Sequence, residues 1–125
     1  MLQGKLIILE LTLNKGVIKM KKIGTQTQTE FFNMIDTGYF IVYFGADWCR
    51  ECQYIRPKLP TIEHEFSQYR FIKVDRDENI QLCLELNVRG LPSFIAYREG
   101  QEIGRFVNGN LKTQPEIENW IRSLK

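Results

Sequence analysis

The feature that most constrains the fold is an uninterrupted apolar run at residues 39–44, Tyr-Phe-Ile-Val-Tyr-Phe, in which every residue is aromatic or β-branched. A run without polar alternation predicts a strand buried on both faces, as in parallel or mixed sheets that helices cover on each side. The whole chain has 125 residues, which is the usual size of one domain. We therefore expect a single α/β domain built around this strand.

Shorter patterns around this run alternate between strand and helix. We predict further strands at residues 21–24, 71–75 and 94–97, and an antiparallel partner at 102–107 after a tight turn at Glu99-Gly100. Helices are predicted after Thr27, over residues 49–68 with a kink at Pro57, around residues 80–86 and after Thr113. The first and last helices open with capping-box spacings, Thr27 with Glu30 and Thr113 with Glu116. This order predicts an α/β fold, a three-layer sandwich with a central mixed β-sheet and helices on both faces.

Two cysteines stand where the central strand gives way to a helix. Cys49 and Cys52 enclose Arg50-Glu51, and the preceding residue is Trp48. At a helix start, unpaired backbone N–H groups and the helix dipole stabilise a thiolate at Cys49. Cys52 follows one helical turn later, close enough to attack a mixed disulfide formed by Cys49. This arrangement indicates thiol–disulfide exchange.

The segment from Phe44 to Cys52, together with Pro57 and Gly90-Leu91-Pro92-Ser93, resembles the thioredoxin family. The resemblance covers nearly the whole chain except residues 1–19. It implies a thioredoxin-like domain over residues 20–125 with catalytic Cys49 and Cys52, and a substrate groove formed by Trp48, Leu91 and a cis Pro92 near Asn108-Gly109. It also implies disulfide-containing protein substrates, a thioredoxin reductase as electron donor, and no bound cofactor or metal.

The sequence departs from the family pattern at three places. Arg50-Glu51 replaces the usual Gly-Pro, and Tyr43 stands where the family keeps a buried aspartate. The lysine that pairs with this aspartate aligns with Phe71, so we expect apolar packing in place of an ion pair. The Cys52 proton would then pass to water, to Tyr43, or to a carboxylate such as Asp47 or Glu51. These departures make a redox-slow binding or adaptor module the alternative function, and an oxidant or isomerase a third.

The other candidate residues have structural interpretations. Cys83 and His64 could complete a zinc site with the cysteine pair, but neither belongs to a second close-spaced couple. Within an apolar helical pattern, Cys83 is predicted to be a small buried side chain. His64 is expected on a solvated helix face, Trp120 in the core, and the charged residues 75–78 in a solvated loop.

Composition limits the partners and the compartment. The 17 basic and 15 acidic residues are scattered, with a net charge of +2, which disfavours nucleic acid as a partner. Three cysteines are too few for a disulfide framework and favour a reducing compartment. Residues 1–19 form an N-terminal extension, interpreted as an upstream start, an extra strand or a disordered tail. Because Glu10 interrupts its apolar run, we expect no signal peptide and no membrane anchor. We also expect the protein to be a cytoplasmic monomer.

Overall fold

One mixed sheet of five strands forms the centre of the molecule in the computed structural model, which describes residues 20–125. The strand order is β1-β3-β2-β4-β5. β1 and β2 run parallel to β3, whereas β4 is antiparallel to both β2 and β5. The bounds are β1 (Lys21–Ile23), β2 (Tyr39–Gly45), β3 (Arg70–Asp75), β4 (Ser93–Arg98) and β5 (Gln101–Phe106).

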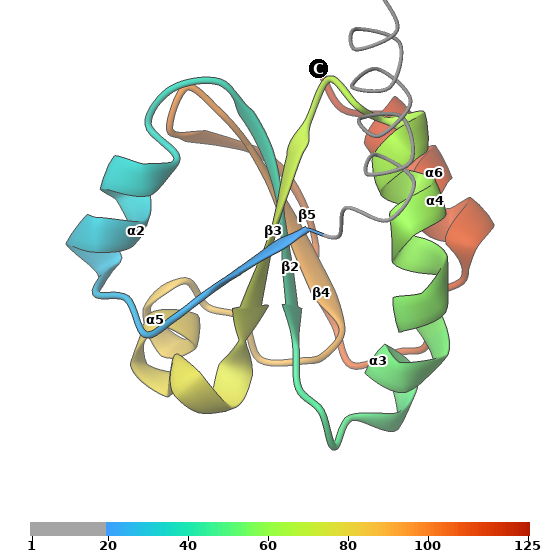
Figure 1. Cartoon of the computed structure of the whole chain (residues 1–125), viewed down its shortest axis with the longest axis horizontal. Coiled ribbons are helices and arrows are strands. Elements are labelled where there is room, and N and C mark those ends of the chain that lie inside the picture. The colour runs from blue at the N-terminus through green and yellow to red at the C-terminus, as the bar shows by residue number, and fades with distance from the viewer. Residues whose placement is uncertain (1–19) are drawn as a thin grey trace, which may run out of the picture.

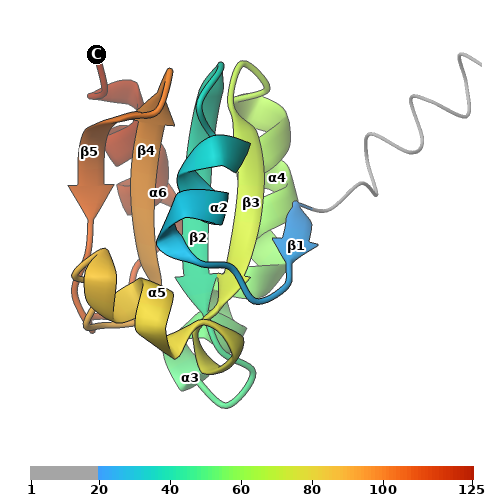
Figure 2. The same ribbon diagram turned by 90° about the vertical axis from the view of Figure 1, so that its left-hand side faces the viewer.

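Helices cover both faces of this sheet, so the molecule has three layers. α2 and α5 lie on one face, and α3, α4 and α6 lie on the other (Figures 1 and 2). The expected α/β sandwich is confirmed. The helical segments are α2 (Gln28–Met34), α3 (Arg50–Ile55), η1 (Arg56–Lys58), α4 (Leu59–Glu65), η2 (Arg76–Glu78), α5 (Ile80–Glu85) and α6 (Gln114–Arg122).

The central strand β2 is buried on both faces, as its apolar run predicts. Phe40, Val42 and Phe44 belong to the hydrophobic cluster beneath α2 and α5. Ile41 and Tyr43 belong to a second cluster on the opposite face. Successive side chains of a strand point to opposite faces, so a strand between two helical layers needs apolar residues at every position.

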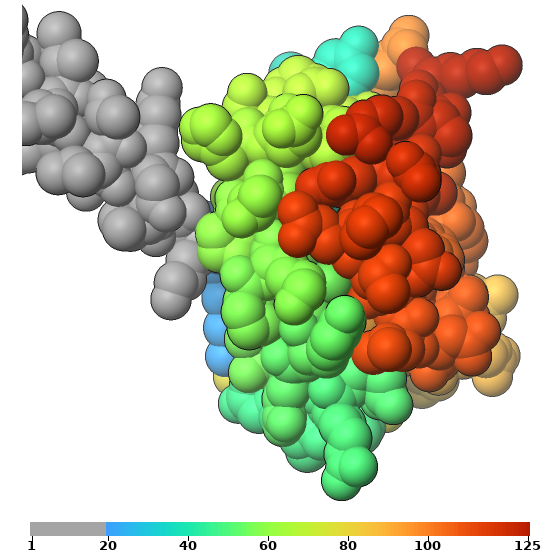
Figure 3. Space-filling model, turned by 90° about the vertical axis from the view of Figure 1, so that its right-hand side faces the viewer, coloured from blue at the N-terminus to red at the C-terminus, as the bar shows by residue number. Residues whose placement is uncertain are grey.

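Local sequence signals set the helix boundaries. Both predicted capping boxes are present: the Glu30 backbone N–H donates to Thr27 Oγ1 at 3.1 Å, and the Thr27 backbone N–H donates to Glu30 Oε1 at 2.8 Å, with the same exchange at the start of α6. The helix predicted over residues 49–68 is divided into α3, η1 and α4. Pro57 supplies no N–H and disfavours a straight α-helix, which accounts for the short 3-10 segment. In Figure 3, α3 and α4 lie beside α6 on one face.

The charged residues 75–78 are not the solvated loop that we expected. Asp75 is buried at the end of β3, and its Oδ1 accepts a hydrogen bond from the Asp77 backbone N–H at 2.8 Å. This bond opens the 3-10 helix η2. Aspartate commonly caps a helical turn in this way, so the run of charges marks a helix start and leaves Asp77 exposed.

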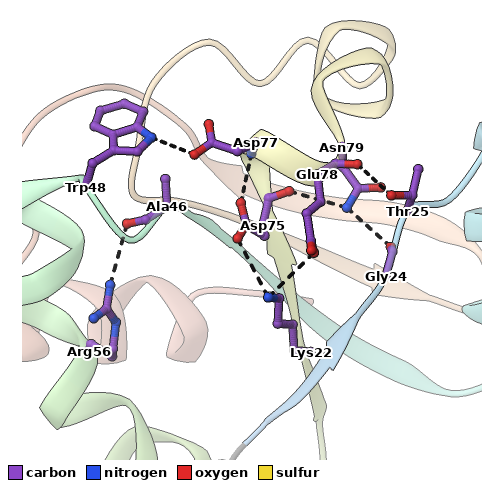
Figure 4. Close-up of polar contacts among 10 residues, drawn as sticks. All are labelled: Lys22, Gly24, Thr25, Ala46, Trp48, Arg56, Asp75, Asp77, Glu78 and Asn79. Atoms are coloured by element: carbon purple, nitrogen blue, oxygen red, sulfur yellow. Dashed lines mark hydrogen bonds and ion pairs between the residues drawn. The ribbon is translucent and has the colours of Figure 1, made fainter.

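Polar contacts fasten β1 and the residues after it to the segment that follows β3. Thr25 Oγ1 donates to the Glu78 carbonyl oxygen at 3.0 Å, and Asn79 Nδ2 donates to the Gly24 carbonyl oxygen at 3.3 Å (Figure 4). Lys22 forms an ion pair with Glu78 at 3.5 Å. We call this set of contacts the edge clasp. Asn79 is buried, so the clasp includes a desolvated part as well as an exposed one.

The predictions made for residues 1–19 concern a segment outside residues 20–125, and the structure does not test them. In the part of the chain that it does describe, every helix is too short or too polar to cross a lipid bilayer. The longest of these helices, α6, has 9 residues.

Candidate active site

The cysteine pair lies in the turn between β2 and the start of α3. Cys49 is the N-cap residue of α3, and its Sγ accepts a hydrogen bond from the Cys52 backbone N–H at 3.2 Å. Cys49 is 4% exposed, Cys52 is fully buried, and both are free thiols. They pack together with Ala46, and Leu91 lies against this small cluster. The predicted position at a helix start is therefore present, with the attacking sulfur in contact with a backbone donor.

Cys52 is held as a thiol by its surroundings. Burial raises the pKa of Cys52 to about 11, and a hydrogen bond with Cys49 adds to the rise. The Ala46 backbone and the Tyr43 hydroxyl act in the opposite direction because they stabilise the thiolate. Cys52 therefore stays protonated at neutral pH until it is needed as a nucleophile.

Tyr43 is a buried neighbour of Cys52. Its side chain is fully buried, and Cys52 is close enough to raise the pKa of its hydroxyl. A side chain at position 45 would collide with this hydroxyl, so Gly45 makes room for the tyrosine. Burial raises the pKa of Tyr43 above its ordinary value. The phenol therefore keeps its proton at neutral pH and does not serve as the final acceptor of the Cys52 proton.

Tyr43 and Phe71 belong to one buried hydrophobic cluster, so the expected apolar packing is present. Phe71 is the cross-strand neighbour of Ile41, whereas the neighbour of Tyr43 on β3 is Lys73. The two residues are separated by two positions in the same strand and so face the same side of the sheet. The chain thus also has a lysine beside Tyr43, at a position other than the one that aligns with the family's lysine.

Trp48 projects from the molecule next to the cysteine pair. Its side chain is 60% exposed, and its Nε1 donates a hydrogen bond to Asp77 Oδ2 at 2.8 Å (Figure 4). The guanidinium group of Arg76 lies over the indole ring, 5.2 Å from its centre. Neither Arg76 nor Asp77 was singled out from the sequence. The topology could have indicated them. β2 and β3 are parallel neighbours, so the residues that follow them, Trp48 and the pair Arg76-Asp77, lie at the same edge of the sheet.

The segment before β4 completes the surroundings of the pair. The Leu91–Pro92 peptide bond is cis, as the sequence resemblance implies. Leu91 is partly buried against the cysteine cluster and Pro92 is buried. Just before them, a side chain at Gly90 would collide with the backbone of Asn108 and Gly109. The Asn108-Gly109 loop therefore lies against this segment, where the resemblance places it.

A buried lysine, which the sequence did not reveal, holds this loop. Lys112 is 1% exposed. Its Nζ donates to the Asn108 carbonyl oxygen at 3.0 Å, to Asn108 Oδ1 at 2.9 Å and to the Asn110 carbonyl oxygen at 3.1 Å. Burial lowers the pKa of Lys112, and nearby Cys52 opposes this effect. Three acceptors on one ammonium group are what a buried charge requires, so residues 108–112 form an internally bonded loop.

Cys83 lies apart from the pair. It belongs to the cluster beneath α2 and α5, on the other side of the sheet from Tyr43. Burial raises the pKa of Cys83 to about 11. The prediction that Cys83 is a small buried side chain is confirmed, and this separation does not fit a zinc site shared with the pair.

The raised pKa of Cys52 predicts a loss of stability in alkali. The unfolded thiol ionises near its ordinary pKa of 9.0, whereas the folded thiol retains its proton up to about pH 11. The stabilisation is complete below the lower value and disappears as the pH rises through the higher one. We expect Cys52 to contribute about 2 kcal/mol to the fall in the free energy of unfolding of the reduced protein, measured in urea, over this interval. Cys83, whose pKa is raised to the same extent, should add a similar contribution. A Cys52→Ser variant should show a smaller fall; an equal fall would contradict this assignment.

Known proteins are similar to this chain in sequence and in architecture. A family model described as Thioredoxin matches residues 22–123. An Aspergillus fumigatus thioredoxin is 35% identical over 92 residues, which are 73% of this chain and 82% of that protein. Thioredoxin-3, mitochondrial, of Saccharomyces cerevisiae is 32% identical over 97 residues, 77% of this chain and 74% of that protein.

Solved structures agree with these matches. The crystal structure of mitochondrial thioredoxin 3 from Saccharomyces cerevisiae in its oxidized form superposes with a TM-score of 0.72 at 28% identity. It covers 87% of this chain and 99% of that one. A domain-wide match in sequence and fold, together with Cys49 and Cys52 at a helix start beside a cis proline, places the chain in the thioredoxin family of thiol–disulfide oxidoreductases.

Proposed function

We propose that this protein reduces disulfide bonds in other proteins, with Cys49 as the attacking and Cys52 as the resolving thiol. The observation that carries the proposal is the geometry of the pair. Cys49 caps α3 with its sulfur bonded to the Cys52 N–H, and Leu91 of the cis Leu91–Pro92 segment packs against both cysteines. The Cys49 sulfur, the atom that attacks the target disulfide, thus already contacts a backbone N–H donor.

The reaction proceeds in two exchanges. The Cys49 thiolate attacks one sulfur of the target, a Cys49–target disulfide forms, and the other target sulfur leaves as a thiolate. Cys52 then loses its proton and attacks Cys49, so that the Cys49–Cys52 disulfide forms and the first target sulfur is released. Two electrons have passed to the target. An external dithiol donor, for which the family membership supports a thioredoxin reductase, restores the pair.

The substrate groove is proposed to consist of Trp48, Leu91 and Pro92. Trp48 offers an exposed aromatic face that Asp77 and Arg76 hold in place, and aromatic side chains of this kind are frequent anchors in protein interfaces. Leu91 packs against the cysteine cluster, and Pro92 follows it through the cis peptide bond. An extended target segment between these walls would present its disulfide to Cys49.

The compartment and the oligomeric state are further proposals. Of the three cysteines, two form the reactive pair and Cys83 is buried in the core, a usage that suits a cytoplasmic, reducing environment. Relatives include a mitochondrial thioredoxin, so cell fractionation should distinguish the two compartments. A single mixed-charge domain supports a monomer that does not bind nucleic acid, and size-exclusion chromatography with light scattering tests the monomer.

A redox titration tests whether the protein acts as a reductant. We expect the native chain to accelerate the reduction of insulin by dithiothreitol. Equilibration with glutathione buffers should give the Cys49–Cys52 pair a midpoint potential of about −220 mV or lower, in the range of reducing cellular pools. A potential near −120 mV would instead identify an oxidant and would contradict this assignment.

A further inference from the structure

A cavity of about 550 Å³ lies behind the cysteine pair, between the sheet and the start of α4. Its floor is a cross-strand row in which Tyr43 on β2, Lys73 on β3 and Lys22 on β1 are neighbours. Residues of η1 and α4 form the opposite wall. We call it the Tyr43 cavity, and its lining is Met20, Lys22, Tyr43, Arg56, Pro57, Leu59, Pro60, Glu63 and Lys73.

Unpaired polar atoms gather at this cavity. Over residues 20–125, four buried side-chain atoms lack a hydrogen-bond partner, and three of them belong to residues that line it: Tyr43 Oη, Arg56 Nε and Glu63 Oε1. Buried polar atoms are normally hydrogen-bonded to protein or to ordered water. The volume exceeds what several water molecules occupy, and the polar groups can anchor them. The Tyr43 cavity is therefore suited to hydrogen-bonded solvent.

Glu63 is the carboxylate of this lining. The charged groups that line the same cavity are Lys22 on β1, Lys73 on β3 and Arg56 on η1, and the Tyr43 phenol on β2 lines it as well. Lys22 is engaged by Asp75 at 3.8 Å and by Glu78. Burial raises the pKa of Glu63, and the backbone of Met20 opposes the rise. A carboxylate shifted toward neutral pH is a better proton acceptor there than an exposed one.

The second exchange needs such an acceptor. Cys52 must lose a proton to attack Cys49, and the Tyr43 hydroxyl is a near neighbour of this thiol. A hydroxyl can accept one proton while it donates its own, so Tyr43 can relay a proton without becoming a phenolate. Resting on the function proposed above, we propose that Glu63 is a positioning residue that accepts the Cys52 proton through Tyr43 and the solvent of the Tyr43 cavity.

The proton and electron balance of this step is complete. The Cys52 S–H bond breaks as the Cys52–Cys49 bond forms and the target sulfur leaves with the electron pair of the mixed disulfide. The Cys52 proton moves to Tyr43, the phenol proton moves into the cavity solvent, and one proton reaches Glu63. Glu63 later returns its proton to bulk water. The cavity that holds Glu63 also contains the positive charges of Lys73 and Arg56, and positive charges nearby favour the carboxylate form.

A two-phase thiol assay separates this role from the first exchange. The reduced protein is mixed with the aryl disulfide that releases the coloured thionitrobenzoate anion. Cys49 releases one anion in the first phase, and Cys52 releases the second when it resolves the mixed disulfide. We expect Glu63→Gln to slow the second phase by about tenfold or more at neutral pH, and to remove its rise with pH. The first phase should keep its native rate.

Three matched variants sharpen the test. Glu65→Gln alters an exposed carboxylate of the same helix and should leave both phases unchanged. Tyr43→Phe should slow the second phase. The double variant with Glu63→Gln should have nearly the same second-phase rate as Glu63→Gln alone, because the two residues act in one path. Lys73→Met should move the pH midpoint of the second phase upward, a shift that a folding defect would not produce.

The outcomes are distinguishable. An unchanged second phase in Glu63→Gln, or an unmoved midpoint in Lys73→Met, overturns the role of Glu63 and leaves the proposed function intact. The absence of a fast first phase in the native protein instead overturns the proposed function. Slowing of both phases by the same factor in Glu63→Gln would indicate a structural role only and would also overturn the proposal.

Discussion

Cys52→Ser should convert the catalyst into a trap that makes one covalent complex with its target and goes no further. Cys49 can still attack the target disulfide, but serine cannot displace the target from Cys49. The mixed disulfide should therefore accumulate to about one equivalent per protein, measured by mass spectrometry or by non-reducing electrophoresis. Cys49→Ser should form no complex, and insulin reduction should fall to the rate of dithiothreitol alone.

Cys83→Ser provides the control for this pair of variants. Cys83 is buried on the opposite side of the sheet, so its replacement should leave both trapping and insulin reduction unchanged. If Cys49→Ser reduced insulin as fast as the native chain, the Cys49–Cys52 pair would not be the reactive centre. The alternative of a redox-slow binding or adaptor module would then become the better account.

Gly90→Ala should damage the substrate groove and the stability of the domain together. The new methyl group would meet the backbone of Asn108 and Gly109, which cannot rotate out of the way as a side chain can. Lys112 bonds that loop from within, so the loop resists displacement. We expect the free energy of unfolding to fall by about 2 to 3 kcal/mol, measured in urea, and the KM for insulin to rise severalfold.

Gly109→Ala is the matched control on the other side of this contact. A methyl group at Gly109 would meet nothing within 4 Å, so this variant should unfold and turn over like the native chain. If Gly90→Ala left both stability and KM unchanged, the loop would not be held against the segment that contains Leu91 and Pro92. If both glycine variants were equally destabilised, the steric collision at position 90 would not be the cause.

The parts of the fold that follow from local chemistry could be predicted from the sequence. The apolar run at residues 39–44 forms the doubly buried strand β2, because burial on both faces needs apolar residues at consecutive positions. Thr27 and Thr113 cap helices since their side chains bond nearby backbone groups whatever the tertiary setting. The position of Cys49 and Cys52 followed from the same kind of local signal.

Register across the sheet could not be predicted in the same way. Phe71 and Lys73 lie on one face of β3, so shifting the strand by two residues preserves the apolar pattern while changing which residue neighbours Tyr43. The pattern of one strand carries no information about its offset from another. Lys73 as the neighbour of Tyr43, and the Tyr43 cavity, were therefore not foreseen.

Burial of charged groups was the other obstacle. Asp75 and Lys112 stand among polar neighbours and were not predicted to be buried, yet both are. Each depends on partners that the chain brings close only after folding into a turn, such as the Asp77 backbone N–H or the Asn108 carbonyl oxygen. A composition argument assigns such segments to solvent because it counts the charges without their acceptors and donors.

The edge clasp also bears on how the molecule should be attached to a bead or an electrode. Tension applied at β1 would pass through Lys22 and Thr25 to Glu78, next to Asp77, which holds the indole of Trp48. The carboxyl end lies at the opposite end of the molecule from α3 (Figure 1). Immobilisation through Lys125 would therefore leave the region around Trp48 mechanically undisturbed, whereas a tether pulling on β1 would strain it.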